Sequence, residues 1–88
     1  MTWEEEKKDL WVNIGLALQE LRAQEGLTQR QAAALASSTQ ARISDLELGR
    51  ADMFVSTLEQ WARVYGYHVE VHFVPIEEDP PSQENHVV

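Results

Sequence analysis

A group of short polar side chains in the middle of the chain has the types and spacing needed to hydrogen-bond the edges of nucleic-acid bases. The amide of Gln40 can bond to N6 and N7 of adenine at once. Arg42 can reach a guanine or a phosphate, or it can pair with Asp45 on its own helix, and the sequence leaves both options open. Ala41 and Thr39 can pack against the methyl group of a thymine. These chemistries predict recognition of double-stranded DNA in its major groove.

Residues on either side of this group are suited to the sugar-phosphate backbone. Gln29 and Arg30 stand at the start of a predicted helix, where backbone N–H groups without an intrahelical partner also attract phosphates. Arg50 follows the next predicted helix and is a second candidate for a phosphate contact. The residues predicted to contact DNA are Gln29, Arg30, Thr39, Gln40, Ala41, Arg42, Ser44, Asp45 and Arg50.

Two short helices with almost nothing between them must position these side chains. Thr28 with Gln31 three residues later forms a capping box, which predicts a helix from residue 29. Thr39 is the N-cap expected for the second helix, and Gly49 suits the left-handed residue that closes it. A two-helix unit this compact cannot bury a core of its own. It can, however, present one helix to a groove, which favours DNA binding.

The second of these helices has two distinct faces. One side carries Ile43, Leu46 and Glu47, and the opposite, short and polar side carries Ala41, Ser44 and Asp45. The first helix carries small residues that would let another helix approach closely, namely Ala32, Ala33 and Ala36. The polar side is therefore predicted to enter the groove, while the other side packs inward.

At these residues the chain resembles the Cro/repressor-like (Xre) helix-turn-helix family, over about residues 10–75. The matching positions are the Leu27-Thr28-Gln29 entry, Ala33 at the helix crossing, and the run Gln40-x-x-Ile43-Ser44-x-Leu46-Glu47-x-Gly49. More narrowly, the chain looks like antitoxins of the HigA type, through Leu21-Arg22, Ala34-Leu35-Ala36, the Arg-Ile-Ser run and the segment from Trp61 to Phe73. The turn departs from the wider family, because Ser37 and Ser38 replace the preferred glycine and apolar residue.

The resemblance implies a mostly α fold: a lambda-repressor-like domain of four to five helices, followed by one C-terminal β-strand that pairs in a dimer. It also implies that Arg22 forms a partly buried structural ion pair with Glu47, where loss of one partner would leave an uncompensated charge. The implied function is a sequence-specific repressor of transcription that regulates its own promoter and acts as a HigA-type antitoxin. The implied partners are an inverted-repeat operator, a second copy of the chain and a small RelE-like ribonuclease toxin.

Two other functions are compatible with the sequence. The chain can be a solitary phage or plasmid repressor without a toxin partner, because such repressors share the motif. It can also be a protein-binding inhibitor with a degenerate helix-turn-helix, because its net charge of −8 opposes DNA. The charge distribution favours DNA binding, since acids concentrate towards both ends while residues 28–50 carry three arginines and two acids. Non-specific affinity should still be weak, because it comes largely from phosphate neutralisation.

A long first helix is predicted ahead of this unit. Thr2 with Glu5 forms another capping box, and helical spacing continues to about Gln24, where Gly26 stops the helix. The aromatic residues of the chain are expected to belong mostly to the core, with Trp3 as the exposed exception.

A loop and a last helix are predicted after residue 50. Met53, Phe54 and Val55 are expected to point inward from the loop. Ser56 with Glu59 three residues later is a capping-box pattern, so the last helix should begin after Ser56.

A strand is predicted over residues 67–74, because the apolar period changes to two and Pro75 follows. Its apolar side is expected to pack on the helices, and His68, Glu70 and His72 to face water. A lone strand leaves backbone groups unpaired, so antiparallel pairing with the same strand of a second molecule is predicted, with recognition helices about 34–36 Å apart. The residues predicted to form this dimer interface are Tyr67, Val69, Val71 and Phe73.

The chain divides into an acidic start of the first helix at 1–9, the DNA-binding domain at 10–66, the dimerisation strand at 67–75 and a disordered acidic tail at 76–88. Its 88 residues without cysteine fit one small domain in a reducing cytoplasm, and neither a membrane span nor a secretory signal is expected. No catalytic arrangement occurs, so we expect no enzyme activity and no cofactor. The alternating histidines and glutamate are interpreted as a solvated face rather than a metal site.

Overall fold

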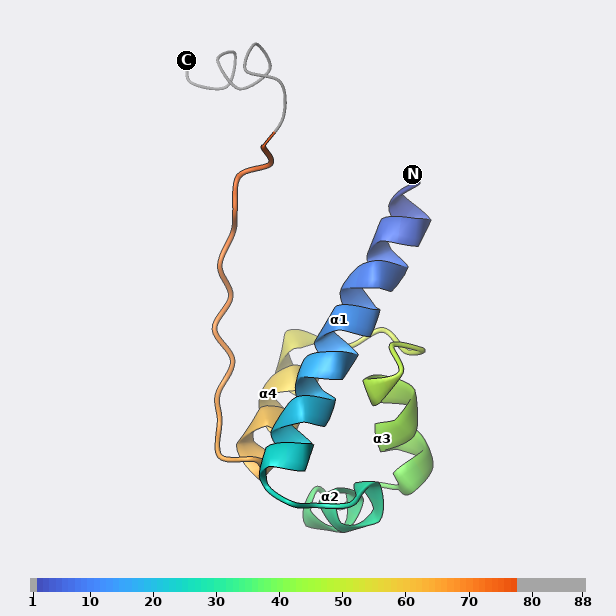
Figure 1. The fold of residues 1–88 in the computed structure, drawn as a ribbon, viewed down its shortest axis with the longest axis vertical. Helices are drawn as coiled ribbons and strands as arrows, with labels where there is room; N and C mark the ends of the chain where they lie inside the picture. Colours follow the sequence, from blue (N-terminus) through green and yellow to red (C-terminus); the bar gives the residue numbers. More distant parts are fainter. Residues whose placement is uncertain (1, 78–88) are drawn as a thin grey trace.

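The computed structural model describes residues 2–77, and within that range it contains four helices and no β-strand (Figure 1). The helices are α1 (Trp3–Gln24), α2 (Gln29–Leu35), α3 (Gln40–Glu47) and α4 (Val55–Val64). The mostly α fold class is thereby confirmed. The tail predicted to be disordered lies, from residue 78 onward, outside the described residues. No helix of the described chain is both long and apolar enough to span a bilayer.

Threonine side chains cap the first three helices. Thr2 Oγ1 accepts a hydrogen bond from the backbone N–H of Glu5 at 3.3 Å, as the capping-box pattern predicted. Thr28 and Thr39 cap α2 and α3 in the same way, each at 3.1 Å from the N–H three residues later. The predicted starts of all three helices and the predicted end of α1 are confirmed. The starts could be predicted because each cap joins residues only three positions apart.

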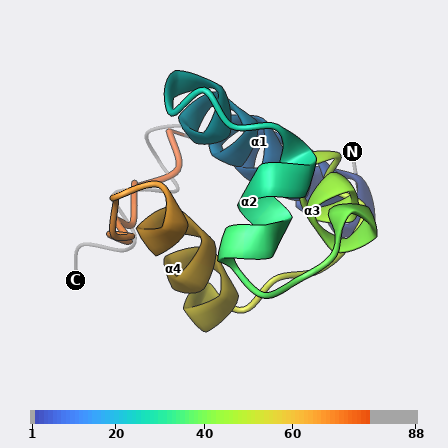
Figure 2. The same cartoon turned by 90° about the horizontal axis from the view of Figure 1, so that it is seen from below.

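The core fills the space where α1, α3 and α4 converge, and α2 lies across one end of that space (Figure 2). Its largest fully buried side chains are Ile43 and Leu46 of α3, each of which contributes about 1.5–3 kcal/mol by leaving water. The other buried members are Leu18, Ala32, Ala33, Met53, Trp61 and Tyr65. Two core side chains from one short helix fix α3 against the domain, so the opposite side of α3 is held outward.

Glycines allow α1 to cross the end of α3 at very short range. A Cβ atom on Gly15 would lie 2.6 Å from the carbonyl oxygen of Leu46, closer than real side chains approach backbone. Gly49, just after α3, has a φ of +72°, and a Cβ there would lie 2.7 Å from the Cα atom of Val12. The two glycines therefore set how closely α1 packs on the recognition unit.

The entry to α4 differs from the prediction. The helix begins at Val55 rather than after Ser56, and its N-cap residue, Phe54, has an extended backbone and supplies no side-chain cap. Met53 is buried as expected, but Phe54 and Val55 are exposed, so their predicted inward placement is wrong. The direction in which a loop side chain points depends on how α4 packs against the other helices. The spacing of residues along the sequence carries no information about that packing.

Residues 67–77 form an extended segment that runs beside α4 and then past the end of the core (Figure 1). The strand predicted at 67–74 is not formed within the described chain, because a strand needs a hydrogen-bonded neighbour and none lies beside this segment. The expected packing on the helices is also largely wrong. Val69 is half-buried, whereas Tyr67, Val71 and Phe73 are exposed.

Candidate DNA interface

The helix pair α2–α3 is joined by a tight turn that requires a left-handed residue. Ser37 occupies that position with a φ of +52°, the one non-glycine residue with positive φ among the described residues. This is the position at which the wider family prefers glycine, so the departure noted in the sequence leaves the turn geometry intact at the cost of some backbone strain. The turn delivers Thr39 directly to the start of α3.

The two faces of α3 are separated as predicted. Ile43, Leu46 and Glu47 are buried on the inner side. On the outer side, Ser44 is half-buried, and the exposed residues are Gln40, Ala41, Arg42 and Asp45. The outer side therefore offers an amide, a methyl group, a hydroxyl, a guanidinium and a carboxylate, which are the groups that can read base edges.

Glu47 is the centre of a buried polar network behind this surface. Arg22 Nε donates to Glu47 Oε2 at 2.7 Å and Arg22 Nη2 donates to Oε1 at 3.0 Å, so the predicted ion pair is present as a two-point contact. Arg22 Nη1 also donates to the carbonyl of Leu27 at 2.9 Å. The hydrogen bond to Glu47 raises the pKa of Arg22 above its ordinary value. The network joins the end of α1, the α1–α2 loop and the end of α3.

Gln29 takes part in this network, which sequence reasoning did not anticipate. Its Nε2 donates to Glu47 Oε1 at 3.0 Å, and the residue is half-buried. The amide N–H₂ of Gln29 thus points into the protein in the free chain, where a phosphate contact had been predicted for it. Thr39, predicted to touch a thymine methyl, uses its hydroxyl oxygen to cap α3. Both residues therefore help to place α2 and α3.

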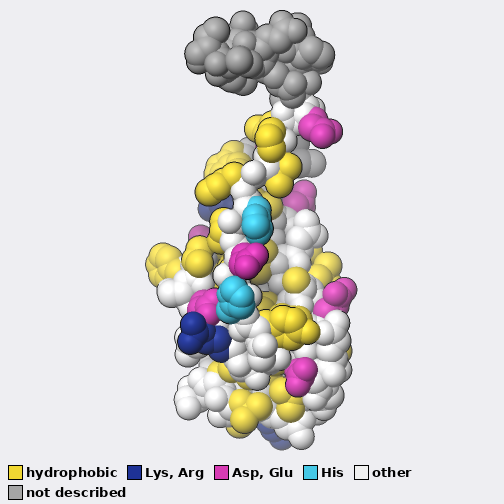
Figure 3. Space-filling view, turned by 90° about the vertical axis from the view of Figure 1, so that its left-hand side faces the viewer, with side chains coloured by type: hydrophobic (Ala, Val, Ile, Leu, Met, Phe, Trp, Pro, Cys, Tyr) yellow, Lys and Arg dark blue, Asp and Glu magenta, His cyan; other side chains and the backbone are white. Residues whose placement is uncertain are grey.

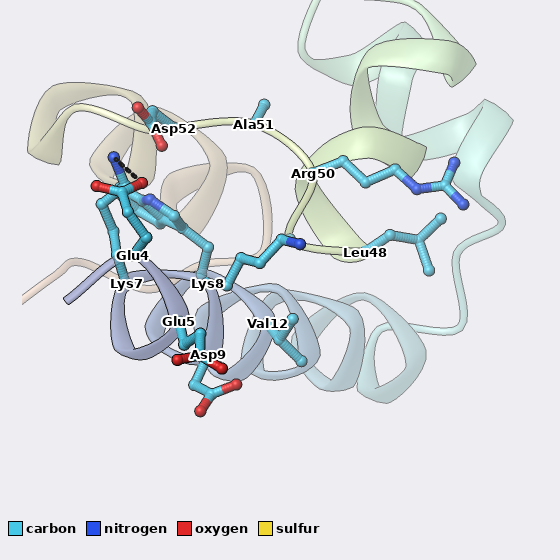
Figure 4. A pocket seen from close by; sticks show the side chains of 12 residues that line it. Glu4, Glu5, Lys7, Lys8, Asp9, Val12, Leu48, Arg50, Ala51 and Asp52 are labelled. Carbon is cyan, nitrogen blue, oxygen red and sulfur yellow. Dashed lines mark ion pairs between the residues drawn. The ribbon is translucent and has the colours of Figure 1, made fainter. Parts of the chain in front are cut away.

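Three arginines around the helix pair carry charge without an acidic partner in the part of the chain that the structure describes. Arg30, Arg42 and Arg50 are exposed, and none of them forms an ion pair with another described residue. In particular Arg42 is not paired with Asp45, so the intrahelical alternative is absent from the structure. Figure 4 shows the Arg50 side chain extending away from the carboxylates of Glu4 and Asp9.

The buried surroundings of Glu47 include the ring of Tyr65 at the end of α4. Its hydroxyl is buried and has no hydrogen-bond partner among the described residues. Burial, followed by the negative charge of Glu47, raises the pKa of Tyr65 to about 12. The tyrosine is therefore neutral under ordinary conditions and leaves the charge balance of the Arg22–Glu47 pair unchanged.

Two structural residues behind the site were missed by sequence reasoning. Gly15 permits the close crossing of α1 over α3, and a lone glycine inside a long helical pattern was the available signal. Glu59 holds the extended segment, because its Oε1 accepts the backbone N–H of Val69 at 2.8 Å. No sequence pattern indicated that contact, since Glu59 had been assigned to a helix cap.

His72 Nε2 lies 3.2 Å from Glu70 Oε1, and residues 2–77 hold no wider metal-ligand cluster.

A short helix lying across a second helix that is buried on one side and polar on the other is the architecture of a DNA-binding domain. The family model described as "Helix-turn-helix domain" matches residues 13–72, and the chain belongs to this family. It is thus a DNA-binding module and not an enzyme. The chain is 38% identical over 69 residues to the HTH-type transcriptional regulator PuuR of Escherichia coli (strain K12) and to the regulator of the same name from Shigella flexneri. The match covers 77% of this chain and 37% of each regulator.

Proposed function

We propose that the chain is a sequence-specific repressor of transcription that binds an inverted repeat in its own promoter as a homodimer. The observation that carries the proposal is the outer side of α3, which exposes Gln40, Arg42 and Asp45 while Ile43 and Leu46 anchor the helix from behind. The similarity to a transcriptional regulator over 77% of the chain supports the regulatory role.

Base reading is assigned to the outer side of α3. Gln40, at the first position of the helix, would bond to an adenine. Arg42, which has no acidic partner within residues 2–77, would bond to a guanine or a phosphate. Asp45 and Ser44 lie further along the helix, where a carboxylate accepts from cytosine N4 and a hydroxyl suits several bases. Ala41 supplies a methyl group for a thymine.

Phosphate contacts are assigned to Arg30 on α2 and to Arg50 after α3, with Gln29 and Thr39 as neighbours that set the helix positions. Arg30 and Arg50 lie on the two sides of α3 along the chain, and both are exposed and unpaired among the described residues. Phosphate contacts on both sides of a reading helix fix its register in the groove.

The dimer is assigned to the extended segment at Tyr67, Val69, Val71 and Phe73. Val71 and Phe73 are 58% and 96% exposed, which leaves apolar surface that a second molecule would cover. A two-fold axis through paired segments would set the two α3 helices about one turn of DNA apart.

The test is a gel-shift titration on the DNA upstream of the chain's own coding sequence, with a fragment of scrambled sequence as control. We expect a specific complex at a protein concentration that leaves the scrambled fragment free, and a footprint with two-fold symmetry. Equal affinity for both fragments would reject sequence-specific repression. A footprint over a single half-site at saturation would reject the homodimer alone.

The antitoxin role rests only on the resemblance of the chain to HigA-type proteins, and it stays a prediction. Its test is co-expression with the neighbouring reading frame. If that frame encodes a small RelE-like ribonuclease, the pair should co-purify and growth arrest by the ribonuclease should be relieved. A neighbouring frame that is neither toxic nor bound would leave a solitary repressor.

A further inference from the structure

The two edges of the extended segment at residues 67–74 are not equivalent. The backbone N–H of Tyr67 donates to the carbonyl of Ala62 at 2.9 Å, and the N–H of Val69 donates to Glu59 Oε1 at 2.8 Å. In an extended chain the backbone groups of alternate residues point to the same edge. The odd-numbered residues therefore turn their backbone groups towards α4.

The opposite edge belongs to the even-numbered residues, and we call it the free edge. It consists of the backbone N–H and C=O groups of His68, Glu70 and His72, none of which hydrogen-bonds to another described residue. Their side chains are exposed, and Figure 3 shows histidine and acidic side chains in a column on the outward face of the segment. The free edge is thus open to another strand.

The apolar side chains of the segment become more exposed as it leaves the core. Val69 is half-buried, Val71 is 58% exposed and Phe73 is 96% exposed. Figure 1 shows the reason: the second half of the segment extends beyond the described end of α4. Within residues 2–77, the apolar surface around Phe73 is therefore left uncovered.

We propose that the free edge pairs antiparallel with the free edge of a second copy about a two-fold axis at Val71. This inference rests on the proposed dimer and specifies its register. Glu70 would then lie opposite the partner's His72, and the two residues would exchange backbone hydrogen bonds. Their side chains, a carboxylate and an imidazole, would be complementary neighbours on one face. Val69 would lie opposite the partner's Phe73, so each exposed phenylalanine would pack beside the half-buried valine of the other molecule.

Other registers place fewer complementary side chains opposite each other. An axis at Glu70 would place two glutamates opposite each other, and an axis at His72 would do the same with two histidines. An axis at Val69 would leave Phe73 without an opposing residue in the segment. The axis at Val71 also tolerates Pro75, since this odd-numbered residue lacks an N–H on the edge opposite the free edge.

Single-cysteine variants test the register, because the natural chain has no cysteine. With the axis at Val71, Val71→Cys forms a non-hydrogen-bonded pair whose two Cα atoms lie about 4.5 Å apart, within the range of a disulfide. Glu70→Cys and His72→Cys, used singly, place like residues on a diagonal of roughly 7–8 Å, beyond easy bridging. We expect mild oxidation to convert most of Val71→Cys to a covalent dimer, and to cross-link a mixture of Glu70→Cys and His72→Cys far better than either alone.

The possible results separate the register from the function. Cross-linking of Glu70→Cys, His72→Cys or Val69→Cys in place of Val71→Cys would overturn the axis at Val71. Cross-linking of none, in a chain that sediments as a dimer, would overturn strand pairing altogether. Gel shifts on the same oxidised samples report DNA binding separately. A dimer that cross-links through Val71→Cys but ignores its upstream DNA would support the register and reject the repressor.

Discussion

Gln40 is the side chain on which sequence discrimination should depend most. It is exposed at the first position of α3, so Gln40→Ala should leave the fold intact and remove a bidentate contact worth about 1–3 kcal/mol at one base pair. The measurement is a competition titration on operators mutated one base pair at a time. Gln60→Ala, an exposed glutamine on α4, is the matched control and should bind like the natural chain. Equal losses on matched and mismatched operators would remove Gln40 from base reading.

Arg22 and Glu47 should act on stability rather than directly on DNA. The pair is buried and bidentate, so Arg22→Ala leaves a buried carboxylate without its cation. The free energy of unfolding should therefore fall by about 3–5 kcal/mol. Thermal unfolding measures this loss. Arg63→Ala is the control, because Arg63 pairs with Glu59 at the surface, where a single pair contributes less than about 1 kcal/mol. An unchanged melting temperature with weakened operator binding would make Arg22 a DNA contact instead.

Tyr65 predicts a loss of stability at high pH. Its pKa is raised to about 12 in the folded chain, so the unfolded chain, with an ordinary tyrosine pKa near 10, releases its proton first. Stability from this group is complete below about pH 10 and declines as the pH rises towards 12. Tyr65→Phe removes the titrating hydroxyl, which has no partner among the described residues. We expect unfolding curves of Tyr65→Phe to show an equal or higher melting temperature at pH 7 and a smaller decline above pH 10.

At the scale of elements, the extended segment makes a directional prediction about proline. Glu70→Pro deletes an N–H on the free edge, whereas Val71→Pro deletes one that faces α4. The two substitutions impose the same backbone restriction one residue apart, so each serves as a control for the other. Sedimentation should show that Glu70→Pro shifts the dimer towards monomer much more than Val71→Pro does. The reverse order would mean that the odd-numbered edge makes the contact.

The helices show which parts of this fold follow from local sequence. The threonine caps at Thr2, Thr28 and Thr39 each bond to an N–H three residues away, so the starts of α1, α2 and α3 were predictable. The start of α4 was not, because Phe54 offers no capping side chain and its place depends on docking. Alternation in residues 67–74 indicated a strand, but a strand also needs a hydrogen-bonded neighbour, which residues 2–77 do not supply. The outer face of α3 followed from helical spacing, whereas the Gln29–Glu47 contact is tertiary.

At the scale of the whole molecule, a chain with a net charge of −8 leaves the salt dependence of operator binding to a few arginines. Phosphate neutralisation is left mainly to Arg30, Arg42 and Arg50 of each copy, which are unpaired among the described residues. Six such contacts in a dimer give a slope of log affinity against log salt of about −5, and the four that are left when Arg42 bonds to a guanine give about −4. Arg30→Ala should flatten that slope by about 2 while weakening all DNA sequences alike. A slope unaffected by Arg30→Ala would place this arginine away from the phosphates.

The position of the extended segment outside the helical core has a consequence for how the proposed repressor would respond to its own abundance. The helices bury their core within one chain, whereas the ribbon of paired segments needs two, so dissociation need not involve unfolding. By mass action, the population able to occupy a two-fold operator then rises with the square of the chain concentration when monomers predominate. The promoter would therefore respond steeply to the concentration of the chain. A fall in that concentration during a pause in synthesis would release the promoter while every remaining molecule was still folded.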